Sequence, residues 1–211
     1  PPLIDLWNLI KDDPRVLLRS YEEMWSKMRD GGKHYFYQVR DSFNLTGDPC
    51  EFFFLLRTCR NGLVRFNRRG EFTAAHHHGR SGIAPEKLGP VIAHWNEKLR
   101  SRDIQFTVGS FEEIRSRRRD FMYLDPPYQT AKAAMYGQFD YGQFFHWLER
   151  QRAPYVLSLN GFDGDKDCRV DVPKWHYDEH LQIDVGKSPY RRPDDDDAPF
   201  VTDSLYVRRE R

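Results

Sequence analysis

The chain has 211 residues, of which 39% are hydrophobic, 31% charged and 15% aromatic. This length allows one domain with an inserted lobe or two small domains. No apolar run approaches the roughly 20 residues of a membrane span, and no signal peptide is visible. The three cysteines, Cys50, Cys59 and Cys168, are far apart and form no CxxC pair. We therefore expect a soluble globular protein of the reducing cytoplasm rather than a membrane or disulfide-rich protein.

The net charge of +1 hides an uneven distribution along the chain. Residues 57–119 contain 14 Lys and Arg and six Asp and Glu, a surplus of +8, which leaves −7 for the remainder. Such a split favours one lobe that faces a polyanion. A solvated charged surface would explain the same numbers.

The first half of the chain has the periodicity of helices. Leu3, Leu6, Trp7 and Ile10 are spaced as on one face of a helix, and Pro14 opens a second helix that Gly31-Gly32 ends. We expect a third helix over 34–44, a buried helix from Cys50 that breaks at Asn61-Gly62, and another over about 86–100. Residues 65–85 are basic and irregular.

The second half alternates strands and helices. Strands are predicted over 104–108, 120–124 and 154–159, with a helix over 142–152, so the middle of this half should be a βαβ unit with parallel strands. Weaker strands are predicted over 169–172, 181–185 and 204–207. The acidic run 194–197 should be a solvated loop.

The stretch FMYLDPPYQT, residues 121–130, joins a short apolar strand to an acid, two prolines and a tyrosine. The prolines must end the strand, and ligands of open α/β sheets bind beyond such carboxyl ends. Asp125 offers an acceptor, Pro126 and Pro127 leave carbonyl groups free, and Tyr128 offers a flat ring. This set suits a planar group with an NH2, such as a nucleobase flipped from its stack. The alternative is a purely structural Pro-Pro turn.

Four segments then resemble the Dam-type, or D12 class, DNA adenine N6-methyltransferases in the order of that family. The helical PPLIDLWNLIKDDP and the basic LRTCRNGLVRFNRRGEF come first, and IQFTVGSFEEI and FMYLDPPYQT follow. Weaker likeness continues through YVLSLNG and TDSLYV. The basic segment together with DPPY is more specific than DPPY alone, and the resemblance covers nearly the whole chain.

The resemblance implies a Rossmann-like α/β methyltransferase core with a mixed, mostly parallel sheet and a helical DNA-recognition insertion. Residues 1–30 and 101–211 would form the core, and 31–100 the basic DNA-recognition lobe. The methyl donor would be S-adenosylmethionine and the acceptor N6 of a flipped adenine in double-stranded DNA. Asp125 and the Pro126 carbonyl would bind the amino group beside Pro127, and Tyr128 would stack on the base. Gly109, Ser110, Phe111 and Asp125 would border the cofactor, although many relatives carry an acid where Ser110 stands. Asn160 would form part of the pocket wall.

The resemblance also gives the basic segment a role in reading DNA. Arginine serves both phosphate and guanine contacts, and any one of these arginines could instead be an ordinary solvated side chain. The residues expected near DNA are Asn61, Arg65, Asn67, Arg68, Arg69 and Arg80. GATC as the target site is a guess, and a host, phage or restriction-modification role stays open.

Parts of the family pattern do not appear in this sequence. The glycine-rich cofactor loop and the acid for the ribose are not found, and the chain begins Pro-Pro, so we expect an N-terminal truncation. We expect a monomer without a metal, because His76, His77 and His78 are consecutive and have no partner at ligand spacing. The competing functions are an amino-group methyltransferase acting on RNA, on cytosine N4 or on a glutamine amide, and a non-catalytic DNA-binding remnant.

Overall fold

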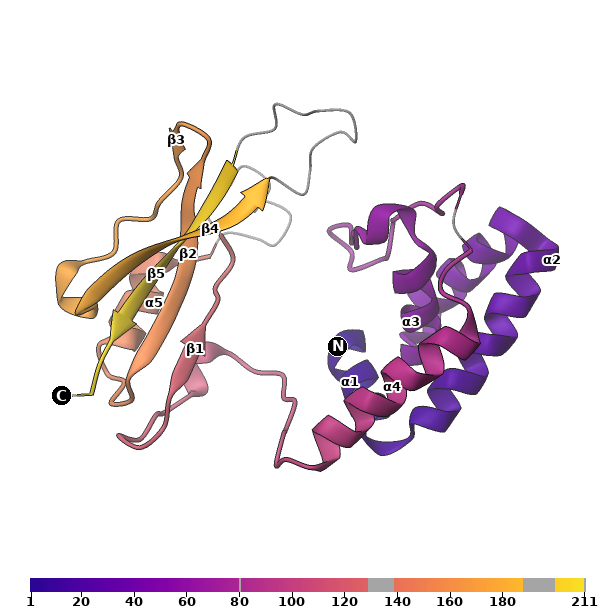
Figure 1. The fold of residues 1–211 in the computed structure, drawn as a ribbon, viewed down its shortest axis with the longest axis horizontal. Helices are drawn as coiled ribbons and strands as arrows, with labels where there is room; N and C mark the ends of the chain where they lie inside the picture. Colours follow the sequence, from indigo (N-terminus) through magenta and orange to yellow (C-terminus); the bar gives the residue numbers. More distant parts are fainter. Residues whose placement is uncertain (80, 129–138, 188–199, 211) are drawn as a thin grey trace. The chain divides into compact units, whose positions relative to one another are not determined.

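The computed structural model describes residues 1–79, 81–128, 139–187 and 200–210. The chain divides into two compact units, Pro1–Gly109 and Ser110–Arg211. The first unit is helical and the second carries the sheet (Figure 1). Of the described helices, none is long and apolar enough to cross a membrane.

Two helices with proline at their starts open the first unit. Helix α1 spans Pro2–Asp12 and α2 spans Pro14–Thr46. The Asp13 side chain caps α2 by accepting a hydrogen bond from the Val16 amide, 3.3 Å away. Gly32, with φ 55° and ψ −143°, breaks α2 into two helical parts. The predicted end of one helix at Gly31-Gly32 and the start of another soon after are therefore confirmed.

Two further helices complete this unit. Helix α3 spans Pro49–Thr58, and its first turn is capped by Asp48, which accepts from the amides of Cys50 and Glu51 at 2.8 and 2.9 Å. It ends before the predicted break, and the 3₁₀ turn η1, Arg60–Gly62, follows it. Helix α4 spans Pro85–Arg100, as predicted. The core between these helices includes the fully buried Leu17, Tyr21, Phe36, Phe54 and Leu55.

The prediction of a strand over 104–108 is wrong. Phe106 stacks on Trp7 of α1 with ring centroids 5.5 Å apart, and the Lys11 ammonium donates to the Ile104 carbonyl at 2.7 Å. These two contacts hold the segment against helix α1, and it pairs with none of the described strands. Residues 1–30 likewise pack within the helical unit, whereas the sequence-based division assigned them to the catalytic core.

The second unit is built on a mixed sheet with the order β1-β2-β5-β4. The strands are β1, Met122–Leu124; β2, Tyr155–Asp163; β4, Glu179–Lys187; and β5, Phe200–Arg208, while the short β3, Lys166–Asp167, pairs with β2. Strands β1 and β2 are parallel, and β5 is antiparallel to both β2 and β4. Thus β1, β2 and β4 run in one direction, which confirms the predicted α/β class with a mixed sheet.

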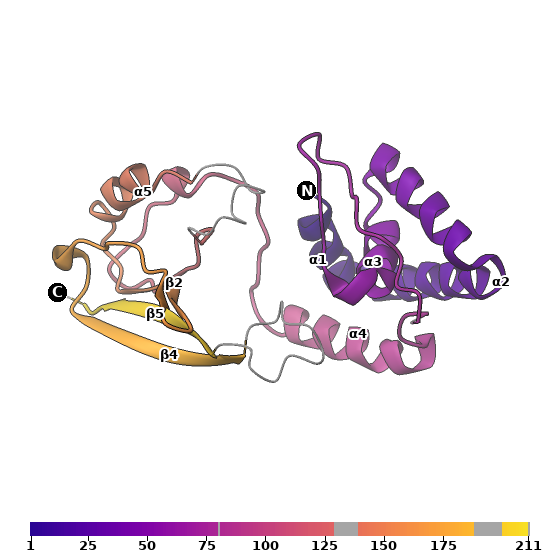
Figure 2. The ribbon, with the colours of Figure 1, turned by 90° about the horizontal axis from the view of Figure 1, so that it is seen from above.

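Helix α5, Tyr141–Leu148, lies between β1 and β2 in sequence and covers one face of the sheet (Figure 2). Trp147 of α5 packs with Tyr155, Leu157 and Leu159 of β2, which alternate with the residues of the other face. The predicted βαβ unit is therefore confirmed.

The predicted strand over 169–172 is wrong. Val170 and Val172 are buried against the same core, but their backbone joins no ladder among the described strands. Every second residue can be buried in an irregular segment that lies on a core. Alternation of polar and apolar residues in the sequence was therefore not enough to identify a strand. The acidic run 194–197 lies outside the described residues.

Candidate functional site

The DPPY stretch follows directly on β1, at the carboxyl end of a parallel strand, as predicted. Asp125 is exposed, Pro126 is buried, and Tyr128 is half-buried. The loop therefore presents its carboxylate to solvent while one proline fixes it to the body of the unit.

The hydroxyl group of Tyr128 is anchored by two strands. It lies 3.2 Å from Ser158 Oγ on β2 and donates to Asp203 Oδ2 on β5 at 3.4 Å. These contacts hold the phenol ring by its polar end. The sequence analysis did not single out Ser158 or Asp203, although both lie in segments quoted for the resemblance, YVLSLNG and TDSLYV.

Burial and charge act together on this cluster. Burial raises the pKa of Tyr128, and the hydrogen bond from Ser158 opposes that rise. Burial also raises the pKa of Asp203, the bond from Tyr128 opposes the rise, and the charge of Asp125 adds to it. The site thus gathers two carboxyl groups whose negative charges disfavour one another.

Asn160 completes the polar group on this part of the sheet. It lies opposite Asp203 in the β2–β5 ladder, and it follows Ser158 by two residues, so both face the same side. Its Oδ1 atom is buried and has no hydrogen-bond partner among the described residues. Such an acceptor is able to take a hydrogen bond from water or from a bound molecule.

The second proline of the motif is held by α5. The Tyr141 hydroxyl group donates to the Pro127 carbonyl at 2.7 Å, and burial raises the pKa of Tyr141 to about 12, so this hydroxyl stays a donor. The Pro126 carbonyl receives no hydrogen bond from the described residues. Of the two proline carbonyl groups, that of Pro126 is left to accept from a ligand.

Along the sequence, the residues expected at the cofactor lie where the first unit ends and the second begins. Gly109 ends the first unit, and Ser110 opens the second by capping η2, Phe111–Glu113, through its Oγ, which accepts from the Glu112 amide at 3.3 Å. The Phe111 ring lies 5.7 Å from that of Phe139, which in turn lies 5.0 Å from the ring of Tyr141. An aromatic row therefore joins Phe111 to the DPPY loop.

Most residues expected near DNA lie on a hairpin of the first unit, residues 65–73. Phe66 and Phe72 form an antiparallel bridge, and the Thr73 amide donates to the Arg65 carbonyl at 2.8 Å. The side chain of Asn44 on α2 binds the backbone of the hairpin. Its Oδ1 accepts from the Phe72 amide at 2.7 Å, and its Nδ2 donates to the Phe72 carbonyl at 3.2 Å. The hairpin is thus fixed to the helical core.

The polar residues at the tip of the hairpin differ in their contacts. Asn67 Oδ1 accepts from the amides of Arg69 and Glu71 at 2.9 and 3.0 Å, and its Nδ2 donates to Glu71 Oε2 at 2.6 Å. Asn67 therefore holds the turn, which leaves its side chain little capacity for a ligand. Arg68 and Arg69 are exposed at this tip, and Arg65 is exposed at the base.

Two other candidates have local explanations or lie outside the described part. Asn61 is exposed and adopts φ 57° in η1, so its backbone conformation accounts for the Asn-Gly pair. Arg80 lies outside the described residues.

The described histidines of the first unit show no sign of a metal site. Burial lowers the pKa of His76, and the centroid of its ring lies 5.2 Å from that of the Phe36 ring. Across the described ranges, no cluster of three or more His, Cys, Asp or Glu could hold a metal ion.

Comparison with known proteins agrees with this geometry. The sequence model of the D12 class N6 adenine-specific DNA methyltransferases matches residues 1–153. The type II methyltransferase M.MjaIII of Methanocaldococcus jannaschii is 27% identical over 187 residues, which cover 75% of this chain and 62% of that protein. The DNA adenine methylase of Escherichia coli K12 is 30% identical over 137 residues, covering 62% of this chain and 47% of that protein.

The DNA adenine methylase of Salmonella typhi is 28% identical over 135 residues, covering 62% of this chain and 47% of that protein. The chain thus spans about half to two thirds of the length of these relatives. The family match includes the helical unit, the hairpin and the DPPY loop, which are the parts that the geometry singles out. On this match, the chain belongs to the D12 class of N6 adenine-specific DNA methyltransferases.

Proposed function

We propose that this chain carries the adenine pocket and DNA-reading hairpin of a site-specific DNA methyltransferase. The enzyme would move a methyl group from S-adenosylmethionine to N6 of a flipped adenine in duplex DNA. The observation that carries the proposal is the exposed Asp125 carboxylate beside Tyr128, whose hydroxyl is anchored to Ser158 and Asp203. An acceptor and a fixed aromatic ring at the carboxyl end of a parallel strand suit a flipped base.

The amino group of adenine needs two acceptors to become a nucleophile. Its nitrogen lone pair is delocalised into the ring, and accepting both N–H hydrogens turns that pair toward an electrophile. The Asp125 carboxylate and the Pro126 carbonyl would be the two acceptors, as the family resemblance implies, and the bond from Tyr141 to the Pro127 carbonyl supports the choice of Pro126. Stacking on the Tyr128 ring would return about 1–3 kcal/mol of the cost of flipping.

S-adenosylmethionine would supply a methyl group on a sulfonium centre when bound. The half-buried Phe111 ring fits the adenine part of such a cofactor, because it lies in the aromatic row that leads to the DPPY loop. Gly109, Ser110 and Asp125 are the other residues that we propose to border it. Transfer of that methyl group, with the carbon–sulfur bond broken, would leave N6 positively charged until it lost a proton. The Asp125 carboxylate can hold that proton before it passes to solvent.

The first unit would supply DNA recognition. Residues 31–100 include the hairpin, whose exposed Arg68 and Arg69 are available for phosphate or guanine contacts. Residues 1–30 share the helical core with this lobe and support it. Arg65, Asn61 and Arg80 remain candidates for DNA contacts, while Asn67 would act through the turn that it holds. We expect the enzyme to work in the cytoplasm as a monomer.

Methyl transfer from a labelled donor to duplex DNA tests the proposal. The chain and the product of the complete reading frame around it are each assayed, because the relatives are longer than this chain. We expect transfer to adenine, and Asp125→Ala should lower the rate by at least about a hundredfold. The matched control Asp171→Ala removes another exposed carboxylate of the same unit and should keep the rate.

Three results would contradict the proposal in different ways. Transfer to RNA or to cytosine in place of adenine would reassign the substrate. Binding of DNA without donor binding or transfer in either protein would indicate a non-catalytic DNA-binding protein. An unchanged rate in Asp125→Ala would remove the role given to the DPPY carboxylate.

A further inference from the structure

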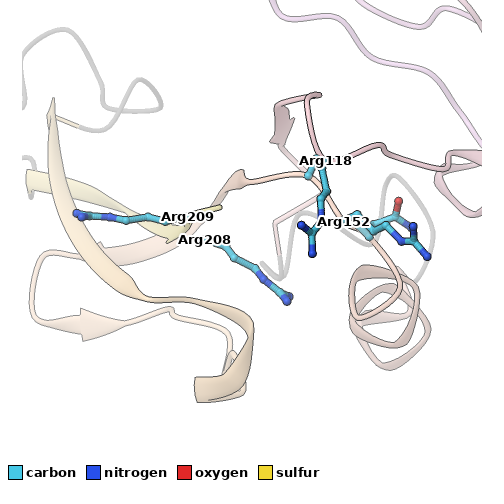
Figure 3. Close-up of a pocket in the computed structure, with 6 residues that line it drawn as sticks. Arg118, Arg152, Arg208 and Arg209 are labelled. Carbon is cyan, nitrogen blue, oxygen red and sulfur yellow. The ribbon is translucent and has the colours of Figure 1, made fainter. Parts of the chain in front are cut away.

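A cluster of arginines, here called the arginine patch, lies in the second unit away from the DPPY loop. It gathers side chains from three separate segments of the chain, the turn after η2, the turn after α5 and the end of β5 (Figure 3). Its members are Arg115, Arg117, Arg118, Arg150, Arg152, Arg208 and Arg209.

The patch surrounds two hollows that share a border. One hollow, of about 510 Å³, is lined by Arg118, Gln151, Arg152, Ala153, Arg208 and Arg209. The other, of about 630 Å³, is lined by Arg115, Ser116, Arg117, Arg118, Arg150 and Arg152. Arg118 and Arg152 line both, so the surface is continuous. None of the described residues that line either hollow is acidic, and none is a lysine.

Hydrogen bonds join the turn after η2 to the turn after α5. Ser116 Oγ accepts from the amides of Arg152 and Ala153 at 3.0 and 3.1 Å. The Ser116 amide donates to Oε1 of the buried Gln151 at 2.9 Å, and Gln151 Nε2 donates to the Trp147 carbonyl at 3.2 Å. These bonds therefore fix the backbone of the two turns that carry the arginines near Ser116 and Gln151.

Few of these charges are neutralised within the unit. Arg209 pairs with Glu179 at 2.7 Å, and Arg208 lies over the Tyr155 ring at 5.8 Å. In the part of the chain that the structure describes, Arg118, Arg150 and Arg152 are exposed and form no ion pair. Guanidinium groups held close together repel unless anions lie among them, and their planar shape fits phosphate through paired hydrogen bonds.

The strand register places the patch at the end of the sheet opposite the DPPY loop. Tyr155 pairs with Met122 at the start of β1 and with Arg208 on β5, whereas Asp125 follows the last residue of β1. The arginine patch and the reacting adenine would therefore lie at opposite ends of β1. The patch belongs to the second unit, whereas the hairpin belongs to the first.

We propose that the arginine patch is a second DNA-binding surface, which holds the phosphate backbone of a duplex segment other than the one that carries the reacting adenine. The choice of DNA as the polyanion rests on the proposed function. Binding here would be independent of sequence, because arginines that contact phosphates carry no base information. It would keep the enzyme on DNA while the adenine pocket is empty.

The test compares two triple variants of the whole chain on a long labelled duplex that contains only G·C pairs. The patch variant is Arg118→Gln, Arg152→Gln and Arg208→Gln. The control variant, Arg15→Gln, Arg19→Gln and Arg102→Gln, removes the same charge from exposed positions of the first unit. The patch variant should lower the slope of log affinity against log salt by about 2–3, because each lost phosphate contact contributes about 0.9. The control should lower it by less than about 0.9.

A bridging assay gives the second readout. Protein bound to an immobilised duplex with an adenine site should capture a second, labelled duplex, and the patch variant should stay on the first duplex without capturing the second. Light scattering checks that the captured species holds one protein, and circular dichroism checks that each variant is folded.

Equal salt slopes for the two triple variants would overturn the proposal. A loss of affinity for single-stranded RNA with unchanged affinity for duplex DNA would replace DNA by RNA as the partner. Neither readout involves methyl transfer. A failure of the proposed chemistry would thus be distinguishable from a failure of this surface.

Discussion

The Tyr141 hydroxyl group donates a hydrogen bond of 2.7 Å to the Pro127 carbonyl oxygen, and so ties the first turn of α5 to the loop after β1. This contact joins the two parts of the βαβ unit at the point where Asp125 and Tyr128 are presented. A prediction about catalysis follows from it.

Tyr141→Phe should slow methyl transfer while the protein stays folded. A net hydrogen bond contributes about 0.5–1.5 kcal/mol, so we expect a fall in kcat of up to about tenfold with a smaller change in KM for DNA. Steady-state kinetics on the active protein measure this change. The control Tyr177→Phe alters a tyrosine of the same unit and should keep kcat. A change confined to KM would show that the contact serves DNA binding instead.

Asn67→Ala should weaken DNA binding through the hairpin rather than through a lost contact. The variant removes the acceptor of two backbone amides and the donor to Glu71, so the turn that presents Arg68 loosens. We expect weaker affinity with the salt slope nearly unchanged. Arg68→Gln, in contrast, should lower the slope by about 0.9, because it removes a phosphate contact.

Asn67→Asp is the matched variant for this experiment. It keeps the oxygen that accepts from the two amides, but it replaces the bond to Glu71 with repulsion between two carboxylates. Its affinity should therefore fall below that of the parent. A salt slope that falls equally in Asn67→Ala and Arg68→Gln would show a direct ionic role for this position.

Asp203→Asn should stabilise the second unit at neutral pH and lose this effect in acid. Burial raises the pKa of Asp203 in the folded protein, so folding favours its protonated form. Protonated Asp203 therefore adds to the free energy of unfolding below its pKa in the unfolded chain, about 3.9. This contribution is lost as the pH rises through its pKa in the folded protein. The amide, which does not ionise, should therefore raise the unfolding temperature at about pH 7 and give little gain near pH 3.

Thermal unfolding of parent and variant across this pH range measures the difference. Asp171→Asn changes an exposed carboxyl of the same unit and serves as the control. A gain for Asp203→Asn that grows as pH falls would contradict the assigned direction of the shift.

Gly161→Ala should destabilise the second unit. A methyl group at this position would lie 2.6 Å from the Thr202 carbonyl oxygen, where the β2–β5 register shifts between Asn160 and Asp163. Overpacking of this kind costs about 1–3 kcal/mol. Denaturant unfolding, followed by the fluorescence of Trp147 and Trp175, reports on this unit. Gly142→Ala in α5 should cost less, because its methyl group would lie 3.2 Å from a side-chain oxygen of Asp140 and alanine favours a helix over glycine by about 1 kcal/mol.

Local sequence patterns were enough to predict most helices and strands and the position of the DPPY loop. Helices α1 to α4 follow from apolar residues at helical spacing and from starts marked by proline and aspartate. The two prolines after β1 end the strand because they cannot continue a ladder. The basic segment was visible as a local charge surplus, although its Asn67 proved to serve the turn.

Contacts between residues far apart in the chain became known only from the folded structure. Ser158 and Asp203 reach Tyr128 because β2 and β5 are neighbours in the sheet, and no spacing along the chain encodes that pairing. The segment 104–108 has strand-like residues, yet contacts with Trp7 and Lys11 outweigh that local preference. The arginine patch likewise arises from three segments that the fold brings to one end of the sheet. Local propensity acts over a few residues, whereas packing and ladder pairing join residues far apart in the chain, so these contacts required the folded chain.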